Sequence, residues 1–270
     1  NVVFRDRSVR KQRGWTSAFT KPNGDTVRGI QQQRQTDLTQ HLYWGAMDKL
    51  FKWNAVSVTD VSRAGGYNGN LNETSVAPAT AWSMVDFGDW MLATNGVDKP
   101  QIYKPANGAF QDLPATFTEA EVFAKRGPYI LAINTTNGPD FVEWSDIDDP
   151  ETWTPTATNN AGNLQFREIR GPLRAAAPFS DRLAIYGTET MFLLDLIGAS
   201  AIFAYEPTLT GLGCVGKMAV TSVAQRNFGF GRQGAWMTDG TQVVYIDEPH
   251  VRQYFQQNIN WDQASKIACW

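Results

Sequence analysis

The sequence repeats one local pattern five times, and this repetition constrains the fold more than any other feature. An apolar run leads into a polar turn, most often with Asn-Gly or Asp-Gly, and a second apolar run follows. The first runs can be aligned on five anchor positions: Leu42, Trp90, Tyr129, Leu183 and Phe228. These anchors are separated by 48, 39, 54 and 45 residues, with a mean of 46.5. Several strands in every 40–50 residues are typical of β-propeller blades, although a sandwich of hairpins would give similar local patterns.

The rest of the composition favours sheets over helices. Runs of 4–8 apolar or alternating residues are separated by Gly, Pro, Asn and Asp, as in all-β chains. Ten Trp among 270 residues need many sites in which to bury large rings. A hydrophobic fraction of 42% excludes wholesale disorder. No run of about 18 apolar residues is present, which predicts no membrane-spanning helix. We therefore expect an all-β fold, a β-propeller-like array of antiparallel blades.

Charge is distributed unevenly along the chain. Residues 1–35 carry a net charge of +6 and residues 36–270 carry −9, although the net charge of the whole chain is only −3. We therefore divide the chain into a basic N-terminal strand or arm, 1–35, and a β-propeller-like domain, 36–270. Such an arm can bind a nucleic-acid backbone or an acidic neighbouring subunit, and a solvated strand and turn is the simpler alternative. The candidate interface residues are Arg5, Arg7, Arg10, Lys11 and Arg13.

The two ends and the two cysteines give further expectations. Asn1 is not Met, and the last residues stop at Trp270 inside an apolar run without a turn. We expect a fragment of a longer or processed protein, incomplete at its C-terminus; a natural frayed end is the alternative. Cys214 and Cys269 exclude a disulfide scaffold. Buried free thiols are favoured for both, and a pairing between them stays open.

Three features could suggest chemistry, and none predicts it. Residues 229–234 match the G-x-G-x-x-G dinucleotide fingerprint, but a β run rather than a helix follows, which favours a glycine-rich hairpin. Four carboxylates within residues 146–151 lack the central Gly of a calcium loop. Only His41 and His250 could act as imidazole bases, and neither lies in a catalytic motif. We therefore expect no catalytic residue, no metal, no cofactor and no enzymatic activity.

The segment from Trp144 to Trp153 is the most specific stretch of the sequence. We expect Asp148 and Asp149 to hold an Asx-type turn before Pro150, leading into a short helical turn. Both Trp rings should then pack beside a blade. These five residues form the candidate structural motif of the chain.

This segment resembles a motif of tailed-bacteriophage virion proteins, W-S-x-x-x-D-P-x-x-W, followed here by Ala161-Gly162. Similar short marks occur elsewhere along the chain. They are the opening residues 1–6 with 11–15, then 87–89 with 94–96, and the Gly-Leu-Gly-Cys-Val run at 211–215. Together they resemble the β-propeller tail hub, or nozzle, of short-tailed bacteriophages.

The resemblance implies a structural virion protein of the phage tail. Copies would form a ring, commonly a hexamer, next to adjacent tail or adaptor proteins and to tail spikes or fibres. Double-stranded genomic DNA would pass transiently through the ring during ejection. The main alternative is a carbohydrate-binding or glycan-hydrolysing β-propeller, because residues 145–153 loosely resemble the Asp-box of sialidases. That box needs a Gly where Asp149 stands. A soluble binding propeller without a virion role is a third possibility.

Overall fold

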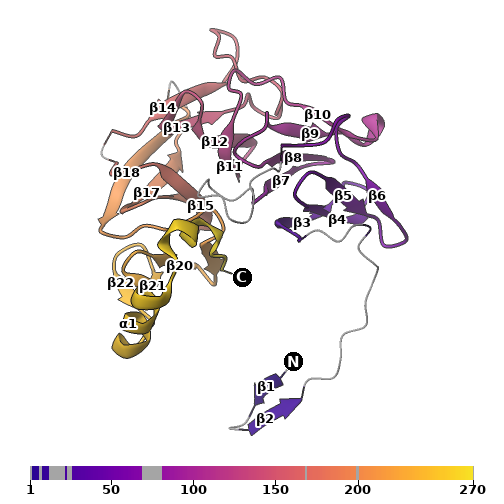
Figure 1. Cartoon of the computed structure of the whole chain (residues 1–270). Helices are drawn as coiled ribbons and strands as arrows, with labels where there is room; N and C mark the ends of the chain where they lie inside the picture. The colour runs from indigo at the N-terminus through magenta and orange to yellow at the C-terminus, as the bar shows by residue number, and fades with distance from the viewer. Residues whose placement is uncertain are drawn as a thin grey trace.

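The computed structural model of the chain describes residues 2–5, 8–11, 22, 26–68, 81–167, 169–198 and 201–269. Five four-stranded antiparallel sheets form its body. In each sheet, strands that follow one another along the chain are hydrogen-bonded neighbours. Figure 1 shows the sheets as successive blades around an arc, with the C-terminus inside it. The predicted propeller-like array is thereby confirmed.

Each blade runs from the strand nearest the inside of the arc to the strand at its rim. The first blade contains β3 (Gly29–Arg34), β4 (Gln40–Gly45), β5 (Leu50–Trp53) and β6 (Val58–Asp60). The second contains β7 (Ser83–Phe87), β8 (Trp90–Thr94), β9 (Gln101–Tyr103) and β10 (Phe110–Asp112). The third contains β11 (Ala120–Arg126), β12 (Tyr129–Thr135), β13 (Gly138–Trp144) and β14 (Gly162–Gln165). The fourth contains β15 (Leu173–Phe179), β16 (Arg182–Gly187), β17 (Thr190–Leu196) and β18 (Phe203–Thr210). The fifth contains β19 (Val220–Val223), β20 (Arg226–Gly231), β21 (Gly234–Thr238) and β22 (Val243–Tyr245).

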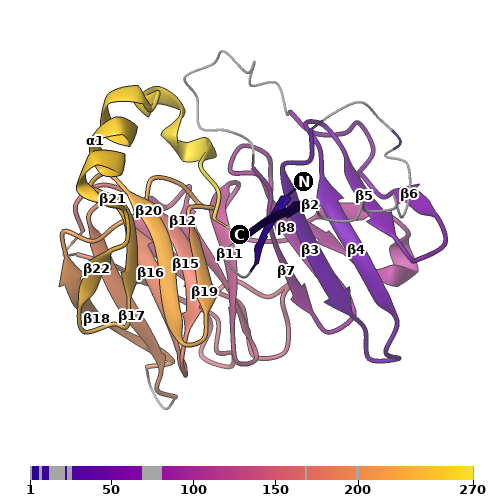
Figure 2. The ribbon, with the colours of Figure 1, turned by 90° about the horizontal axis from the view of Figure 1, so that it is seen from below.

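The remaining elements lie outside the blades. A separate hairpin pairs β1 (Val2–Arg5) with β2 (Ser8–Lys11), and a 3-10 helix η1 (Pro105–Asn107) joins β9 to β10. After the fifth blade come α1 (Pro249–Asn258) and the 3-10 helix η2 (Trp261–Lys266). Figure 2 shows α1 beside β21, at the end of the fifth blade.

The five repeated units correspond to the five blades. Each anchor lies in the second strand of its blade, namely β4, β8, β12, β16 and β20. The second and third strands are the most apolar because both faces of a middle strand are covered. In β12 and β17, for example, six of seven and five of seven residues are buried. The five repeated units of the sequence therefore mark the most deeply buried strands of the five blades.

The hydrophobic core is divided into layers between neighbouring blades. The inner strands β3, β7, β11, β15 and β19 approach one another in that order. Aromatic rings fill each layer: Trp82 between blades one and two, Trp153 between two and three, Trp144 between three and four, and Trp236 between four and five. All four rings are 7% exposed or less. Stacking of blades thus supplies the burial sites for these four rings.

The blade array begins earlier in the chain than the expected boundary at residue 36. Strand β3 is already the inner strand of the first blade, paired with β4 over its whole length from Gly29↔Gly45 to Arg34↔Gln40. Of the basic arm, β1 and β2 are described, and they pair only with each other. None of the described helices has the length and apolar character that crossing a bilayer requires.

A buried lysine ties the fifth blade to blades two and three across the inside of the arc. The Lys217 ammonium, whose side chain is 3% exposed, lies 3.6 Å from a carboxylate oxygen of Glu121. It donates to the carbonyl oxygen of Asn95 at 3.2 Å. Burial lowers the pKa of Lys217, and Glu121 opposes that effect. The hydrogen bond between Lys217 and Asn95 joins residues 122 positions apart along the chain.

The C-terminal segment packs on the inner edge of the fifth blade. The Cys269 amide donates to the carbonyl oxygen of Met218 at 2.8 Å. Ser265 lies so close to Gly216 that an added Cβ would overlap its carbonyl oxygen, which explains the glycine there. A hollow of about 770 Å³ lies between this segment and the start of the first blade around Val27 and Ile30.

Candidate functional site

The two Trp of the phage-like segment serve different inter-blade cores. The Trp144 indole packs edge-on against Phe203 at 5.1 Å, and its Nε1 donates to the carbonyl oxygen of Asn160 at 2.8 Å. The Trp153 indole packs edge-on against Phe117 at 5.0 Å, and its Nε1 donates to the carbonyl oxygen of Pro150 at 2.8 Å. Both rings are buried, so neither offers a face to a ligand.

The carboxylates of this segment hold its turn, but not as expected in every detail. The Asp149 carboxylate accepts from the Glu151 amide at 3.0 Å and from the Thr152 hydroxyl at 2.8 Å. Asp146 Oδ1 accepts from two amides, those of Ile147 and Asn160, at 2.8 and 2.7 Å.

Asp148 acts through its backbone instead. Its φ of 54° places it in the left-handed region, which Asp tolerates better than most residues. Its carboxylate has no hydrogen bond within the described part of the chain. The segment forms turns around an isolated Asp146↔Asp149 bridge, so the expected short helical turn is wrong. Among the described residues, no group of three or more potential metal ligands gathers.

The predicted interface residues fall at the edge of what the structure describes. Arg5 ends β1, and Arg10 and Lys11 close β2, in the register Val3↔Arg10 and Val2↔Lys11. Arg7 and Arg13 lie outside the described residues. Arg5, Arg10 and Lys11 therefore share one short hairpin, whose two strands pair with no blade strand in the described part of the chain.

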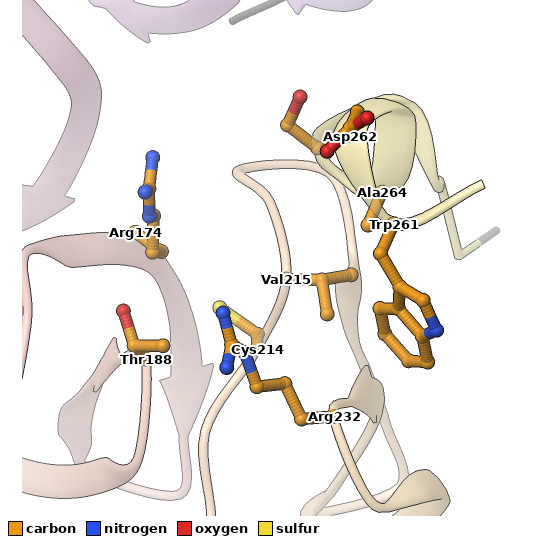
Figure 3. Close-up of a pocket in the computed structure, with 9 residues that line it drawn as sticks. Arg174, Thr188, Cys214, Val215, Arg232, Trp261, Asp262 and Ala264 are labelled. Atoms are coloured by element: carbon orange, nitrogen blue, oxygen red, sulfur yellow. The ribbon is translucent and has the colours of Figure 1, made fainter. Parts of the chain in front are cut away.

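A cleft lies between the fourth and fifth blades. Two hollows of about 490 and 530 Å³ adjoin there, and both are lined by Thr188 and Arg232. Pockets of this size hold small ligands. Figure 3 shows that side chains from several separate parts of the chain meet around the first hollow.

The local backbone explains how these side chains reach the cleft. Arg174 occupies an irregularity in the β15–β16 ladder, between the paired residues Leu173 and Ala175. Arg232 stands in the tight turn between β20 and β21, within the glycine-rich hairpin that the sequence predicted. Thr188 follows β16, and Gly213 packs so tightly on it that an added Cβ would overlap the Thr188 carbonyl.

The C-terminal segment supplies the opposite wall. Trp261 and Asp262 come from η2 and lie across the hollow from Arg174 and Thr188 (Figure 3). The Trp261 indole is 39% exposed, and its Nε1 donates to the carbonyl oxygen of Gln256 at 3.3 Å. An aromatic surface thus borders a hollow that also holds guanidinium groups.

The described residues that line the cleft include one thiol and no imidazole. Its one thiol belongs to Cys214, and burial raises the pKa of that thiol to about 12, so it stays protonated at neutral pH. Cys214 and Cys269 are both free, as favoured from the sequence, but only Cys214 is buried and Cys269 is half-buried. Neither His lies in the cleft: His41 bonds Gln35 on the first blade, and His250 is exposed at the start of α1.

Sequence reasoning missed this cleft. The sequence did contain a signal for Arg232, because the glycine-rich hairpin at 229–234 predicts a tight turn, and Arg232 reaches the cleft from that turn. Arg174 and Trp261 had no local signal, because only the stacking of two blades and the return of the C-terminal segment bring them together.

The sequence matches no family model and no curated protein. Solved structures, however, match it along most of its length. The structure of YjhT matches with a TM-score of 0.50 and 11% identity, covering 79% of this chain and 74% of that one. The structure of U3-55K matches with a TM-score of 0.52 and 9% identity, covering 85% and 68%.

A third match is a catalytically inactive virginiamycin B lyase from Staphylococcus aureus with quinupristin. Its TM-score is 0.55 at 12% identity, covering 87% of this chain and 75% of that one. Identities this low carry information about the fold alone. Together with the five stacked four-stranded sheets, they establish that the chain has a β-propeller fold.

Proposed function

We propose that this chain is a structural subunit of a bacteriophage tail hub or nozzle, that it works as one copy in a ring, and that it is not an enzyme. The observation that carries the proposal is the structural role of the segment from Trp144 to Trp153. Its sequence resembles a phage virion motif. Its two indole rings pack in the cores that join three blades, and its carboxylates hold the turn between the rings. A motif whose side chains stabilise the packing of the blades favours a scaffold over an active site.

The same segment weighs against the carbohydrate-active alternative. Sugar rings stack on exposed aromatic faces, whereas Trp144 and Trp153 are 7% and 2% exposed. A glycosidase also needs a pair of carboxylates free to exchange protons with the substrate. Here Asp146 and Asp149 accept two hydrogen bonds each, and Glu151 forms an ion pair with Lys104.

The N-terminal hairpin supports assembly between copies. A two-stranded hairpin with four-residue strands is marginally stable in water unless it packs on another surface. Figure 1 shows β1 and β2 apart from the blades of their own chain. A basic hairpin of this kind suits the acidic body, net −9 over residues 36–270, of a neighbouring copy or of an adjacent tail protein.

The fifth blade supplies an apolar surface for the same purpose. On the face turned away from blade four, Val223 is 55% exposed, Val244 42% and Ile246 53%. The corresponding face of blade four is buried against Trp236 and its neighbours. Buried apolar area would supply most of the binding free energy, and the charges would set the register.

In this role the acidic body has a further use. Double-stranded DNA carries dense negative charge, so an acidic wall repels it and lets it pass during ejection. Spikes or fibres and adaptor proteins would attach around the ring.

The proposal is tested by reversing the charge of the arm. Arg5, Arg7, Arg10, Lys11 and Arg13 are changed to Glu, and assembly is followed by light scattering and by incorporation into tails. The matched control reverses Arg167 and Arg226, which are exposed on the body and form no ion pair with the described residues.

We expect the arm variant to lose ring assembly while its circular dichroism and melting temperature stay unchanged, and the control to assemble normally. Normal assembly of the arm variant would refute the role of the arm. Hydrolysis of a glycan by the unmodified protein would refute the whole proposal in favour of the enzyme.

A further inference from the structure

The cleft between blades four and five holds three arginines that the fold does not use. Arg170, Arg174 and Arg232 line its two hollows. Within the described chain, none of the three guanidinium groups has an ion pair or a hydrogen bond.

Several other arginines of the fold are paired. Arg63 pairs with Asp98 and Asp112, Arg182 pairs with Asp195 and Glu206, and Arg252 pairs with Asp247. Arg174 is half-buried, and a half-buried guanidinium without a partner costs solvation free energy that a bound anion would restore. The cleft therefore gathers planar bidentate donors that match carboxylate and phosphate oxygens.

The positive charge of the cleft comes from its arginines. Lys217 is already paired with Glu121, so this buried pair carries little net charge and does not compete for a ligand. An anion entering the first hollow would meet Arg174 and Arg232.

The other lining groups point to a ligand with hydroxyl groups. Glu189 and Asp262, both exposed, border the hollows and accept hydrogen bonds without donating any. The Thr188 hydroxyl already donates to the carbonyl oxygen of Pro172 at 3.4 Å, which leaves its oxygen free to accept. An anion without hydroxyl groups has no donor to offer to these three acceptors.

The Trp261 indole adds an apolar face to the same hollow. The C–H face of a sugar ring packs well on such an aromatic surface. The two hollows, about 490 and 530 Å³, have room for one or two sugar rings.

We propose that this cleft binds an acidic sugar unit. Its oxyanion, a carboxylate or a phosphate, lies against Arg174 and Arg232; its hydroxyls donate to Thr188, Glu189 and Asp262; and its ring lies by Trp261. This site is independent of the tail-hub proposal, and it is a binding site without a catalytic step.

The test is calorimetric titration of the full chain with four probes: glucuronate, glucose 6-phosphate, glucose and inorganic phosphate. We expect the two acidic sugars to bind and glucose to bind at least tenfold more weakly. Their relative affinities decide whether the natural oxyanion is a carboxylate or a phosphate. Arg174→Gln and Arg232→Gln should each weaken the acidic sugars at least tenfold, with melting temperatures unchanged. The matched control is Arg226→Gln, which removes an exposed arginine of the fifth blade, the blade of Arg232, outside the cleft. This variant should bind the acidic sugars as the unmodified chain does.

Three results would overturn the proposal. The first is no binding of either acidic sugar at millimolar concentration. The second is equal binding of glucose, or binding that survives the loss of both arginines. The third is inorganic phosphate binding as tightly as glucose 6-phosphate, which would make this a simple anion site. Because assembly is not measured, failure here leaves the tail-hub proposal standing, and failure of assembly leaves this site standing.

Discussion

Removing the Trp153 ring should destabilise the protein severely without touching any binding surface. The indole is 2% exposed and packs between Phe117, at 5.0 Å, and Phe123, at 6.4 Å, in the core of blades two and three. A buried Trp side chain covers about 200 Å² of apolar surface, which at about 25 cal/mol/Å² corresponds to about 5 kcal/mol. Substitutions of buried Trp by Ala cost about 3–5 kcal/mol in practice.

Trp153→Ala should fall at the upper end of that range, because the Pro150 carbonyl loses the indole N–H that donates to it at 2.8 Å. Trp153→Phe keeps most of the apolar surface and loses the hydrogen bond, so we expect about 1–2 kcal/mol. Trp144→Ala should cost about 3–5 kcal/mol through the neighbouring core. Val56→Ala, at a side chain 90% exposed, is the control and should change the free energy of unfolding by about 0.5 kcal/mol or less.

The assay is urea unfolding at equilibrium, followed by far-ultraviolet circular dichroism so that loss of a Trp does not distort the signal. Variants are ranked by the urea concentration at the midpoint of unfolding, with the same dependence of the unfolding free energy on urea assumed for all of them. The reasoning is refuted if Trp153→Ala unfolds at the same urea concentration as the unmodified protein. Unchanged unfolding together with lost sugar binding would show instead that these rings form a ligand site.

Three further predictions concern titration and reactivity. Hydrogen bonds from the Thr241 amide and hydroxyl hold the pKa of the Asp239 carboxyl at about 2, so stability should fall as pH drops from about 4 toward 2; Asp239→Asn should flatten that fall in acid-unfolding curves, and an equally steep fall would contradict it. Burial lowers the pKa of Lys217, so the unfolded state binds more protons than the folded state just below pH 10.5, and the free energy of unfolding should rise with pH there. Lys217→Met should remove this rise in urea unfolding measured between about pH 8 and 10. A rise that persists in the variant would show that another group causes it. Iodoacetamide should modify half-buried Cys269 and spare buried Cys214 in the folded protein, and mass spectrometry showing Cys214 modified as fast would contradict the burial.

The blade count could be predicted from the sequence because the second and third strands of each blade are covered on both faces. Runs such as Tyr129 to Ala132 and Met191 to Leu194 are therefore continuously apolar and stand out between polar turns. Rim strands are less visible; β22 has no buried residue. The first strand of the first blade falls within the basic arm because the arm was delimited by its charge, and β3, with three Gln in a row, has no apolar run to mark it as a strand.

The helix α1 had no pattern by which to be predicted. None of its ten residues is buried, so the apolar periodicity that marks a packed helix is missing. Pro249 at its first turn is a helix-start signal, but without a buried face that signal is weak.

The cleft illustrates what a sequence alone does not contain. Arg174 and Trp261 are far apart along the chain, and they line one hollow because blade five stacks on blade four and the C-terminal segment folds back. The turn at residues 144–153 was predicted in kind but not in detail. Asp146 rather than Asp148 supplies the second carboxylate, because Asp148 takes the left-handed backbone conformation that reverses the chain.

Negative-stain electron microscopy of the purified full-length protein tests the central claim most directly. A tail-hub subunit should appear as closed rings of identical, propeller-sized lobes, and the arm variant should appear as separate lobes under the same conditions. Separate propeller-sized particles of the unmodified protein, at every protein concentration and at low salt, would contradict the account.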